Sequence, residues 1–296
     1  MLYFTSLSVA VAFGQLPVAR YLYETLYRKR EDMGLISKKD IDGGKSFDWG
    51  RVSCDYAAYR DIYPEVLYKK LVDMGLCIEG QNVLDIGTGT GVLPRNLYKY
   101  GARFTGIDIA QNQIEQAKLL AAESGMDISF YCTPAESCEF ADGSFDVITA
   151  CQCMTYFHHE RLAPVLCRFL KTGGRFVVIF MVWLPQEDKI AHETEKLIMK
   201  YNPMWNAGNL TRFRVVVPKP YEQYFEMINE DSFDVMLPFT RDSWRGRIRA
   251  CRGIGASLDE ADVTSFDQEH GNMLRQIAPP DFEILHYCSI TTLKVK

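Results

Sequence analysis

No two cysteines in this chain have the CxxC spacing, although nine cysteines occur in 296 residues. An odd number of thiols scattered through apolar segments excludes a disulfide framework. It is typical of reduced, mostly buried thiols in a cytosolic protein. The net charge is −5, which argues against a broad basic surface for nucleic acid. Internal repeats and low-complexity segments are absent as well, so a repeat architecture is not predicted.

The N-terminal stretch 1–19 is mostly apolar, but no basic residue precedes it, and Gln15, Pro17 and Arg20 interrupt it. It is therefore a poor signal peptide, and too short and polar for a transmembrane helix. We expect an additional amphipathic helix there, or an extension upstream of the true start. A helical segment is expected over about 18–33, followed by a polar, glycine-containing linker over 37–50.

Five short apolar runs alternate with helical patterns in the next part of the chain, and the runs cover 82–87, 103–109, 127–132, 145–151 and 175–183. The helical patterns lie between them at 91–100, 111–124 and 160–170, and glycines at 101, 125 and 173–174 follow their ends. Near-continuous apolar strands that alternate with helices indicate a parallel sheet covered on both faces. The predicted fold class is α/β, with a doubly wound sheet.

Strand patterns return at 232–238 and 282–295, which brings the expected number of strands to seven in a mostly parallel sheet. The intervening segment 184–230 is rich in aromatic residues and proline, and we expect it to fold over the sheet as a lid. The predicted organisation is an N-terminal helical extension and linker over 1–50, and a main domain over 51–296 that contains this insertion.

A glycine loop follows the first of these strands, in the sequence VLDIGTGTGV over 83–92. Such a loop lies at the carboxyl edge of a parallel sheet, where helix N-termini direct free N–H groups outward and glycines let a ligand approach. Its G-x-G-x-G spacing departs from the dinucleotide fingerprint, which would place a glycine at Val92, and no Gly-Lys-Ser/Thr follows as in a P-loop. Asp85 precedes the first glycine by two residues. We expect its carboxylate and nearby carbonyls to meet an amino-acid ammonium group.

Asp108 ends the second predicted strand, where an acidic side chain accepts hydrogen bonds from both hydroxyls of a ribose. This requirement is common to NAD and S-adenosylmethionine, so Asp108 alone does not discriminate between them. The combination of Asp108 with the glycine spacing favours S-adenosylmethionine.

Five motifs in this order resemble the class I S-adenosylmethionine-dependent methyltransferases: VLDIGTGTG, GIDIA, PAE at 134–136, FDVITACQCMTYF at 145–157 and FLKTGGRFVV at 169–178. The resemblance spans roughly 51–183 and implies the Rossmann-like methyltransferase fold. YAAYRDIYP at 56–64 also resembles the N-terminal helix of the small-molecule branch, near trans-aconitate-type enzymes. The implied cofactor is S-adenosylmethionine, with S-adenosylhomocysteine as its product and no metal.

The resemblance implies a role for each matching position. The methionine portion would be lined by Asp85, Gly87, Thr88, Gly89 and Gly91. Asp108 would hold the ribose, and Ile109, Ala135 and Glu136 would surround the adenine. Cys151 and Gln152 would lie beside the sulfonium, Gln113 would reach the carboxylate or ribose, and Tyr56 and Arg60 would close over the cofactor.

Other residues near these motifs have both a structural and a functional interpretation. Cys151 and Cys153 are expected to be buried small hydrophobic residues; a thiolate site for arsenite would need a third cysteine, Cys54 or Cys132. His158 follows the fourth strand and is a candidate general base, with Tyr156 beside it. Aromatic residues that pack in the core or wall an acceptor pocket are Tyr156, Trp183, Trp205, Tyr221 and Trp244.

A helix over 241–252 carries five arginines. A solvated or salt-bridged face is the default interpretation, and anchoring of an acceptor carboxylate is the alternative. Neither an Asn/Asp-Pro-Pro-Tyr motif nor a Pro-Cys pair follows the fourth strand, which disfavours DNA bases as acceptors.

The sequence thus predicts methyl transfer from S-adenosylmethionine to a small molecule in the cytoplasm, by in-line displacement, without nucleic acid or membrane partners. A cysteine-dependent metalloid or thiol methyltransferase is the first alternative. A non-catalytic sensor or scaffold that binds S-adenosylmethionine is the second.

Overall fold

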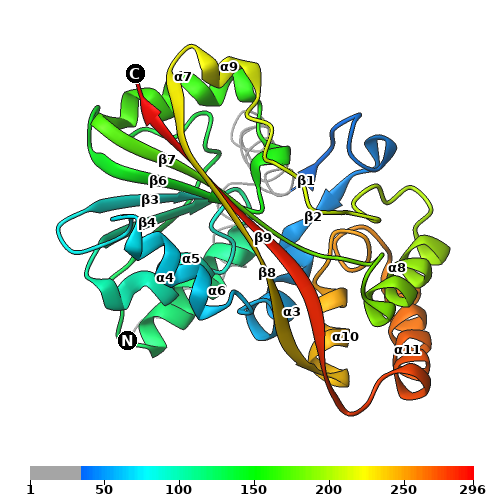
Figure 1. The fold of residues 1–296 in the computed structure, drawn as a ribbon. Coiled ribbons are helices and arrows are strands. Elements are labelled where there is room, and N and C mark those ends of the chain that lie inside the picture. The colour runs from blue at the N-terminus through cyan, green and yellow to red at the C-terminus, as the bar shows by residue number, and fades with distance from the viewer. Residues whose placement is uncertain (1–34) are drawn as a thin grey trace, which may run out of the picture.

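A seven-stranded sheet forms the centre of the molecule in the computed structural model, which describes residues 35–296 (Figure 1). The strand order is β5-β4-β3-β6-β7-β9-β8. The first five strands in this order are parallel, and β9 is antiparallel to both of its neighbours. The strands are β3 (Asn82–Ile86), β4 (Arg103–Asp108), β5 (Ser129–Cys132), β6 (Phe145–Cys151), β7 (Leu170–Trp183), β8 (Phe225–Thr240) and β9 (Asp281–Val295). The predicted doubly wound, mostly parallel, seven-stranded α/β sheet is confirmed.

The parallel strands are apolar on both faces because successive side chains enter two different cores. Val83 and Val147 pack against α4 (Glu65–Asp73) and α5 (Val92–Leu97). Leu84 and Ile148, the next residues along the same strands, pack against α7 (His159–Phe169) on the opposite face. All four strand residues are at most 1% exposed. This two-sided burial produces the near-continuous apolar runs of the sequence.

Helices cover the two faces of the sheet in the way these cores require. Figure 1 shows α4, α5 and α6 (Gln111–Glu123) on one side, and α7 and α9 (Lys219–Glu222) on the other. Short 3-10 helices complete the connections: η2 (Asp42–Gly44), η3 (Trp49–Val52), η4 (Tyr98–Tyr100) and η5 (Met154–Tyr156). Within residues 35–296, none of the helices has the length and apolar character needed to cross a membrane.

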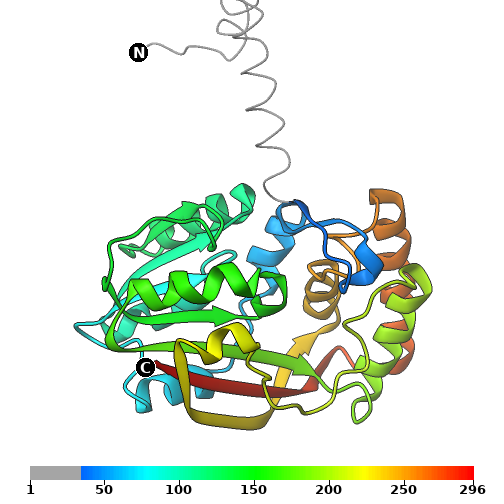
Figure 2. The same cartoon turned by 90° about the horizontal axis from the view of Figure 1, so that it is seen from above.

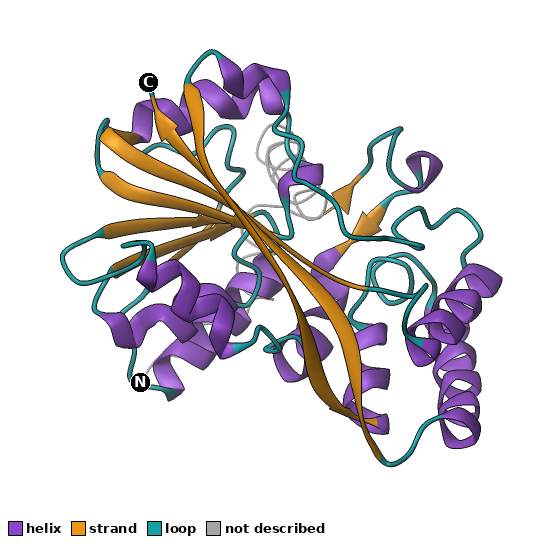
Figure 3. Ribbon diagram, viewed as in Figure 1, coloured by secondary structure: helices purple, strands orange, loops and turns teal. Residues whose placement is uncertain are grey.

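Strands β8 and β9 extend past the parallel strands and carry a second group of helices (Figure 3). We call this group the cap: α8 (Lys189–Tyr201), which follows β7, and α10 (Arg241–Arg249) and α11 (Glu260–Ile277), which lie between β8 and β9. The cap has its own apolar core around Trp244, which is fully buried against Trp183 and Phe239.

The cap is joined to the N-terminal part of the domain through α3 (Ser53–Tyr59), which packs against α10 (Figure 2). Arg249 of α10 forms ion pairs of 2.9 Å with Asp55 of α3 and with Asp267 of α11. Gly246 leaves room for this packing, since a Cβ there would lie 2.2 Å from the ring of Tyr59. The cap is therefore held at a fixed position beside the sheet.

Residues 37–50 are a packed segment and not the expected linker. They include β2 (Phe47–Asp48), which pairs antiparallel with β1 (Leu35–Ile36). Ile41 and Phe47 are 5% and 1% exposed and pack against Val52. Two apolar side chains are enough to anchor the segment, so its polar, glycine-containing composition was misleading. The helix expected over 18–33 and the interpretation of 1–19 lie outside the described residues.

Two strands begin earlier than expected. The sequence KTGG at 171–174 lies in β7 as a bulge and does not end the preceding helix, since the register passes from Leu170 directly to Arg175. Strand β8 begins at Phe225, so the segment inserted after β7 covers 184–224 and not 184–230. β8 is an edge strand with many exposed polar side chains, and its pairing with β9 uses backbone groups that leave no apolar pattern.

Candidate active site

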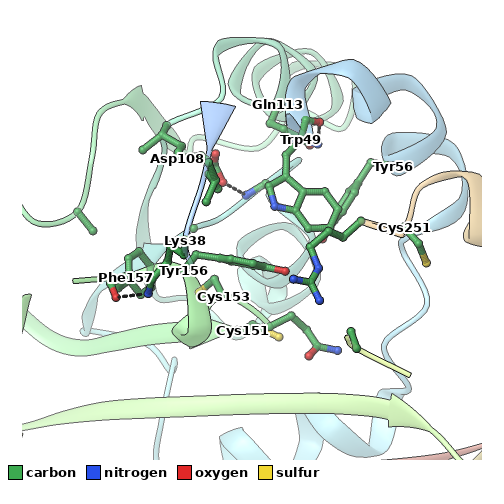
Figure 4. A pocket seen from close by; sticks show the side chains of 18 of the residues that line it. Lys38, Trp49, Tyr56, Asp108, Gln113, Cys151, Cys153, Tyr156, Phe157 and Cys251 are labelled. Carbon is green, nitrogen blue, oxygen red and sulfur yellow. Dashed lines mark hydrogen bonds between the residues drawn. The ribbon is translucent and has the colours of Figure 1, made fainter. Parts of the chain in front are cut away.

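A cavity of about 470 Å³ opens between the cap and the carboxyl ends of the parallel strands (Figure 4). The predicted site residues that line it are Tyr56, Arg60, Gly87, Gly89, Asp108, Ile109, Gln113, Ala135, Glu136, Cys151, Gln152, Tyr156 and His158. Asp85, Thr88 and Gly91 are not part of its wall. This edge of a doubly wound sheet is the usual position of a small-molecule site.

The three glycines of the loop after β3 all have positive φ, but they serve different contacts. A Cβ at Gly87 would lie 2.8 Å from the Cβ of Cys153, and one at Gly91 would lie 2.7 Å from the ring of Phe130. Both positions therefore need glycine so that the loop can pack. At Gly89 the nearest atom to a Cβ would be 3.5 Å away, in the ring of Tyr56, so this glycine borders open space in the cavity.

Asp108 connects the end of β4 to the glycine loop. Its Oδ2 accepts a hydrogen bond from the Gly89 N–H, and its Oδ1 accepts one from the Ala110 N–H, both at 2.9 Å. Burial raises the pKa of Asp108, while these backbone donors lower it in part. Each carboxylate oxygen keeps further acceptor capacity toward the cavity.

Loops after β5 and β6 form the adjoining wall. Glu136 Oε1 accepts a hydrogen bond from the backbone N–H of His158 at 2.8 Å, which joins the two loops. His158 is itself exposed at the mouth of the cavity. Gln152 has a φ of +63°, an uncommon conformation for a residue with a side chain, and its amide donates to the Met181 carbonyl. This hydrogen bond ties the end of β6 to β7.

Residues of the N-terminal segment close the cavity from the opposite side, and Figure 4 shows Trp49, Tyr56 and Tyr156 around one space. The ring of Trp49 lies 6.1 Å from that of Tyr56 and 6.0 Å from that of Tyr156. Gln113 donates to the Trp49 carbonyl at 2.9 Å, so its amide nitrogen holds this segment to α6. Lys38 fixes the same segment to the loop after β6 through the carbonyls of 155 and 157.

Sequence reasoning missed Trp49, Lys38 and Cys251, all of which line the cavity. Of the five arginines over 241–252, for which a charged surface and an acceptor anchor were the two interpretations, Arg247 and Arg252 line the cavity. Of the aromatic candidates, Tyr156, Trp183 and Trp205 line it, whereas Tyr221 and Trp244 are fully buried in the cores. A signal for Arg247 was available. It lies three residues after Trp244 and one before Ile248, on the apolar face of the helix.

The cysteines do not assemble a metalloid site in the described part of the chain. No group of three His, Cys, Asp or Glu side chains that could hold a metal ion occurs within residues 35–296. Cys54 is exposed on α3, and Cys153 is buried and donates to the Ile86 carbonyl at 3.1 Å. Burial raises the pKa of Cys151 and of Cys153 far above the ordinary thiol value, so both are protonated at neutral pH.

Asp85 lies beneath the glycine loop, with 2% of its surface exposed. Its Oδ1 accepts a hydrogen bond of 2.6 Å from the Thr149 hydroxyl of the neighbouring strand. Burial raises the pKa of Asp85 to about 6, although hydrogen bonds from Thr149 and Thr88 lower it in part and the charge of Asp108 adds to the rise. Direct contact of this carboxylate with a ligand ammonium stays a prediction; the position indicates support of the loop from below.

We expect Asp85→Asn to stabilise the protein at neutral pH. A carboxyl whose pKa is raised in the folded state leaves the free energy of unfolding unchanged below about pH 4, where it is protonated. It lowers that free energy progressively as the pH rises toward 6, and by a constant amount above pH 6. Asp85→Asn should therefore raise the free energy of unfolding by roughly 2–3 kcal/mol above pH 6. The Asn side chain still accepts the hydrogen bond from Thr149. Thermal unfolding of variant and wild type at about pH 4 and pH 7.5 measures it.

Asp146→Asn is the matched control on a neighbouring strand. Burial raises the pKa of Asp146, but hydrogen bonds from Lys171 and the backbone of Asn82 outweigh it, so the net shift is downward. This variant should lose stability at neutral pH, the opposite sign to Asp85→Asn. A melting temperature of Asp85→Asn that stays below the wild type at both pH values would contradict the assignment.

The parallel sheet, the glycine loop after its first strand and the acid at the end of the second define a Rossmann-like ligand-binding domain. Residues 83–174 match the family described as methyltransferase domain. The ubiquinone biosynthesis O-methyltransferase of Chromobacterium violaceum is 30% identical over 131 residues, which are 43% of this chain and 54% of that protein. Its counterpart in Idiomarina loihiensis is 34% identical over 98 residues, 32% of this chain and 40% of that protein. Residues 83–174 are thus similar to a methyltransferase domain, and they include the glycine loop and Asp108.

The chain spans about half the length of the curated relatives it matches. Among solved structures, the geranyl diphosphate C-methyltransferase of Streptomyces coelicolor A3(2), in complex with Mg²⁺, geranyl diphosphate and S-adenosylhomocysteine, is 16% identical with a TM-score of 0.43. The comparison covers 78% of this chain and 78% of that one. The family match falls on the strands and loops that form one wall of the cavity, whereas the cap lies outside the matched residues.

Proposed function

We propose that this protein transfers a methyl group from S-adenosylmethionine to a small-molecule acceptor bound between the sheet and the cap. The observation that carries the proposal is the carboxylate of Asp108 at the cavity wall, held by the Gly89 and Ala110 N–H groups next to a loop of positive-φ glycines. An acid fixed in this way suits a ribose diol, and the methyltransferase family match over 83–174 supports the choice of donor.

The residues of the cavity fit the donor in size and chemistry. Asp108 would accept the ribose hydroxyls, Ile109 and Ala135 would pack on the adenine, and Gly89 would leave space for the methionine portion. Arg60 lies on the ring of Tyr56 and forms no ion pair within the described residues, so it is available for the methionine carboxylate. When bound, S-adenosylmethionine supplies a methyl group on an electrophilic sulfonium.

The chain's own contribution is alignment, exclusion of water and control of protons. Trp49, Tyr56 and Tyr156 would shield the reacting atoms from solvent on the N-terminal side. Burial raises the pKa of Tyr156 to about 12, so at neutral pH its hydroxyl keeps its proton and acts as a hydrogen-bond donor. His158, exposed at the mouth, is the candidate base for an acceptor hydroxyl.

Two measurements test the proposal. S-adenosylhomocysteine should raise the melting temperature and NADH should not, because the loop lacks the dinucleotide spacing. Incubation with methyl-labelled S-adenosylmethionine and a small-molecule extract should then yield a labelled product and S-adenosylhomocysteine. Stabilisation by NADH alone would reverse the assignment. Binding without label transfer would favour a non-catalytic sensor that uses the same fold.

A further inference from the structure

Arg247 is a charged side chain that the cap buries at the cavity wall. It is 4% exposed, on the same face of α10 as the fully buried Trp244 and Ile248. Its guanidinium lies over the ring of Trp183, 5.1 Å from the centroid. A buried charge of this kind is costly unless a partner compensates for its lost hydration.

No carboxylate within residues 35–296 forms an ion pair with Arg247. One terminal nitrogen donates to the Cys251 sulfur at 3.0 Å, and the Nε has no hydrogen-bond partner in this part of the chain. Burial, followed by the charge of Arg60, lowers the pKa of Arg247 to about 10, so it is still charged at neutral pH. The described residues therefore supply no anion that compensates for this buried charge.

Three other arginines of the same segment do form ion pairs with carboxylates. Arg245 lies 2.5 Å from Asp267, and Arg249 lies 2.9 Å from Asp55. Arg252 also lines the cavity, but it is 3.4 Å from Asp42. Arg241 has no carboxylate partner either, but its guanidinium donates to the Ala278 carbonyl and does not line the cavity. Of the arginines of this segment that line the cavity, Arg247 alone lacks a carboxylate partner within the described residues.

The wall around Arg247 is otherwise apolar and aromatic. Trp183, Trp205 and Met181 line this end of the cavity and are at most 9% exposed. The carboxylate of Glu195 on α8, beside Trp183, already has partners: its oxygens accept from the Trp183 indole N–H at 2.5 Å and from the Asn209 N–H at 2.6 Å. This end of the cavity thus combines one unpaired cation with a flat apolar surface.

We propose that the methyl acceptor is an organic acid, an apolar or aromatic small molecule whose carboxylate binds Arg247 with its body against Trp183 and Trp205. This inference rests on the proposed function. With Arg60 assigned to the donor's carboxylate, one unpaired guanidinium is left, and a singly charged carboxylate matches it better than a doubly charged phosphate. The positive sulfonium of the donor would add to the attraction for an anion.

Pairs of aromatic acids and their neutral amides test the proposal in the protein saturated with S-adenosylhomocysteine. The probes are benzoate against benzamide, phenylacetate against phenylacetamide, and indole-3-acetate against indole-3-acetamide, with phenyl phosphate as a separate arm. Titration calorimetry should give at least one acid that binds about tenfold or more tightly than its amide. Equal responses to acid and amide, no response included, or preferential binding of phenyl phosphate would overturn the proposal.

Arg247→Met is the diagnostic variant, and Arg245→Met is its matched control on the same helix. Arg247→Met should lose the preference for the acid, keep its affinity for S-adenosylhomocysteine within about twofold, and melt a few degrees higher because an uncompensated buried charge is gone. Arg245→Met should keep the preference. A lower melting temperature of Arg247→Met would show that Arg247 stabilises the fold, and it would overturn the proposal. If the wild type fails to bind S-adenosylhomocysteine at all, the proposed function itself fails.

Discussion

Replacing Asp108 with alanine is expected to weaken binding of S-adenosylhomocysteine by about two orders of magnitude. The carboxylate is the one acidic group that the cavity presents at the end of β4, and two hydrogen bonds from ribose hydroxyls to a charged acceptor are each worth about 1.5–3 kcal/mol. The fold should survive, since Asp108 forms no ion pair within the described residues and contacts only backbone donors of adjacent loops. Titration calorimetry and circular dichroism measure the two effects.

Asp108→Asn and Asp142→Ala are the control variants for this experiment. Asn keeps one acceptor oxygen without the charge, so it should fall between wild type and alanine. Asp142 is exposed and lies 3.4 Å from Arg168, away from the cavity wall, so its loss should leave the affinity unchanged. Unaltered binding in Asp108→Ala would remove the ribose assignment.

A second large effect is expected for Gly91→Ala, in this case on stability. Gly91 has a φ of +72° at the start of α5, and its Cβ would lie 2.7 and 2.9 Å from two ring atoms of Phe130, a buried side chain. A left-handed conformation costs an alanine about 1–2 kcal/mol, and overpacking adds about 1–3 kcal/mol. The free energy of unfolding should therefore fall by about 2–5 kcal/mol in urea denaturation.

Alanine substitutions at two other glycines distinguish the cost of the backbone conformation from the cost of the close contact with Phe130. Gly125 has a φ of +65° with nothing within 4 Å of a Cβ, so Gly125→Ala should cost only the conformational part, about 1–2 kcal/mol. Gly89→Ala should cost a similar amount of stability but lower the affinity for S-adenosylhomocysteine, because its methyl group would enter the cavity beside Tyr56. A loss of stability in Gly91→Ala no larger than in Gly125→Ala would show that Phe130 moves away without cost.

The sheet could be predicted because its evidence is local. Strands β3 and β6 are buried on both faces, so runs such as 145–151 stand out from the helical patterns beside them, and β6 has the bounds that the sequence indicates. The early part of β8 could not be predicted in this way. It is an exposed edge held by backbone hydrogen bonds to β9, and backbone groups leave no trace in the side-chain pattern.

The wall of the cavity formed by the glycine loop and Asp108 was equally readable, since the loop and the acid after the next strand are separated by a short stretch of chain. The wall formed by the cap was not. Arg247 reaches the cavity only because β8 and β9 extend past the parallel strands and α10 packs against α3, where Gly246 meets Tyr59. Trp49 lies in a segment whose composition suggested a linker.

By itself the sequence determined the α/β class, the position of the glycine loop and the position of Asp108 at the end of the second strand, because turn geometry and strand burial impose residue types at short range. Only the tertiary structure decided that Arg247, one of five arginines over 241–252, lines the cavity without a carboxylate partner among the described residues. That choice depends on contacts of α10 with α3, α11 and β7, all distant in the chain, and the spacing within one helix does not encode them.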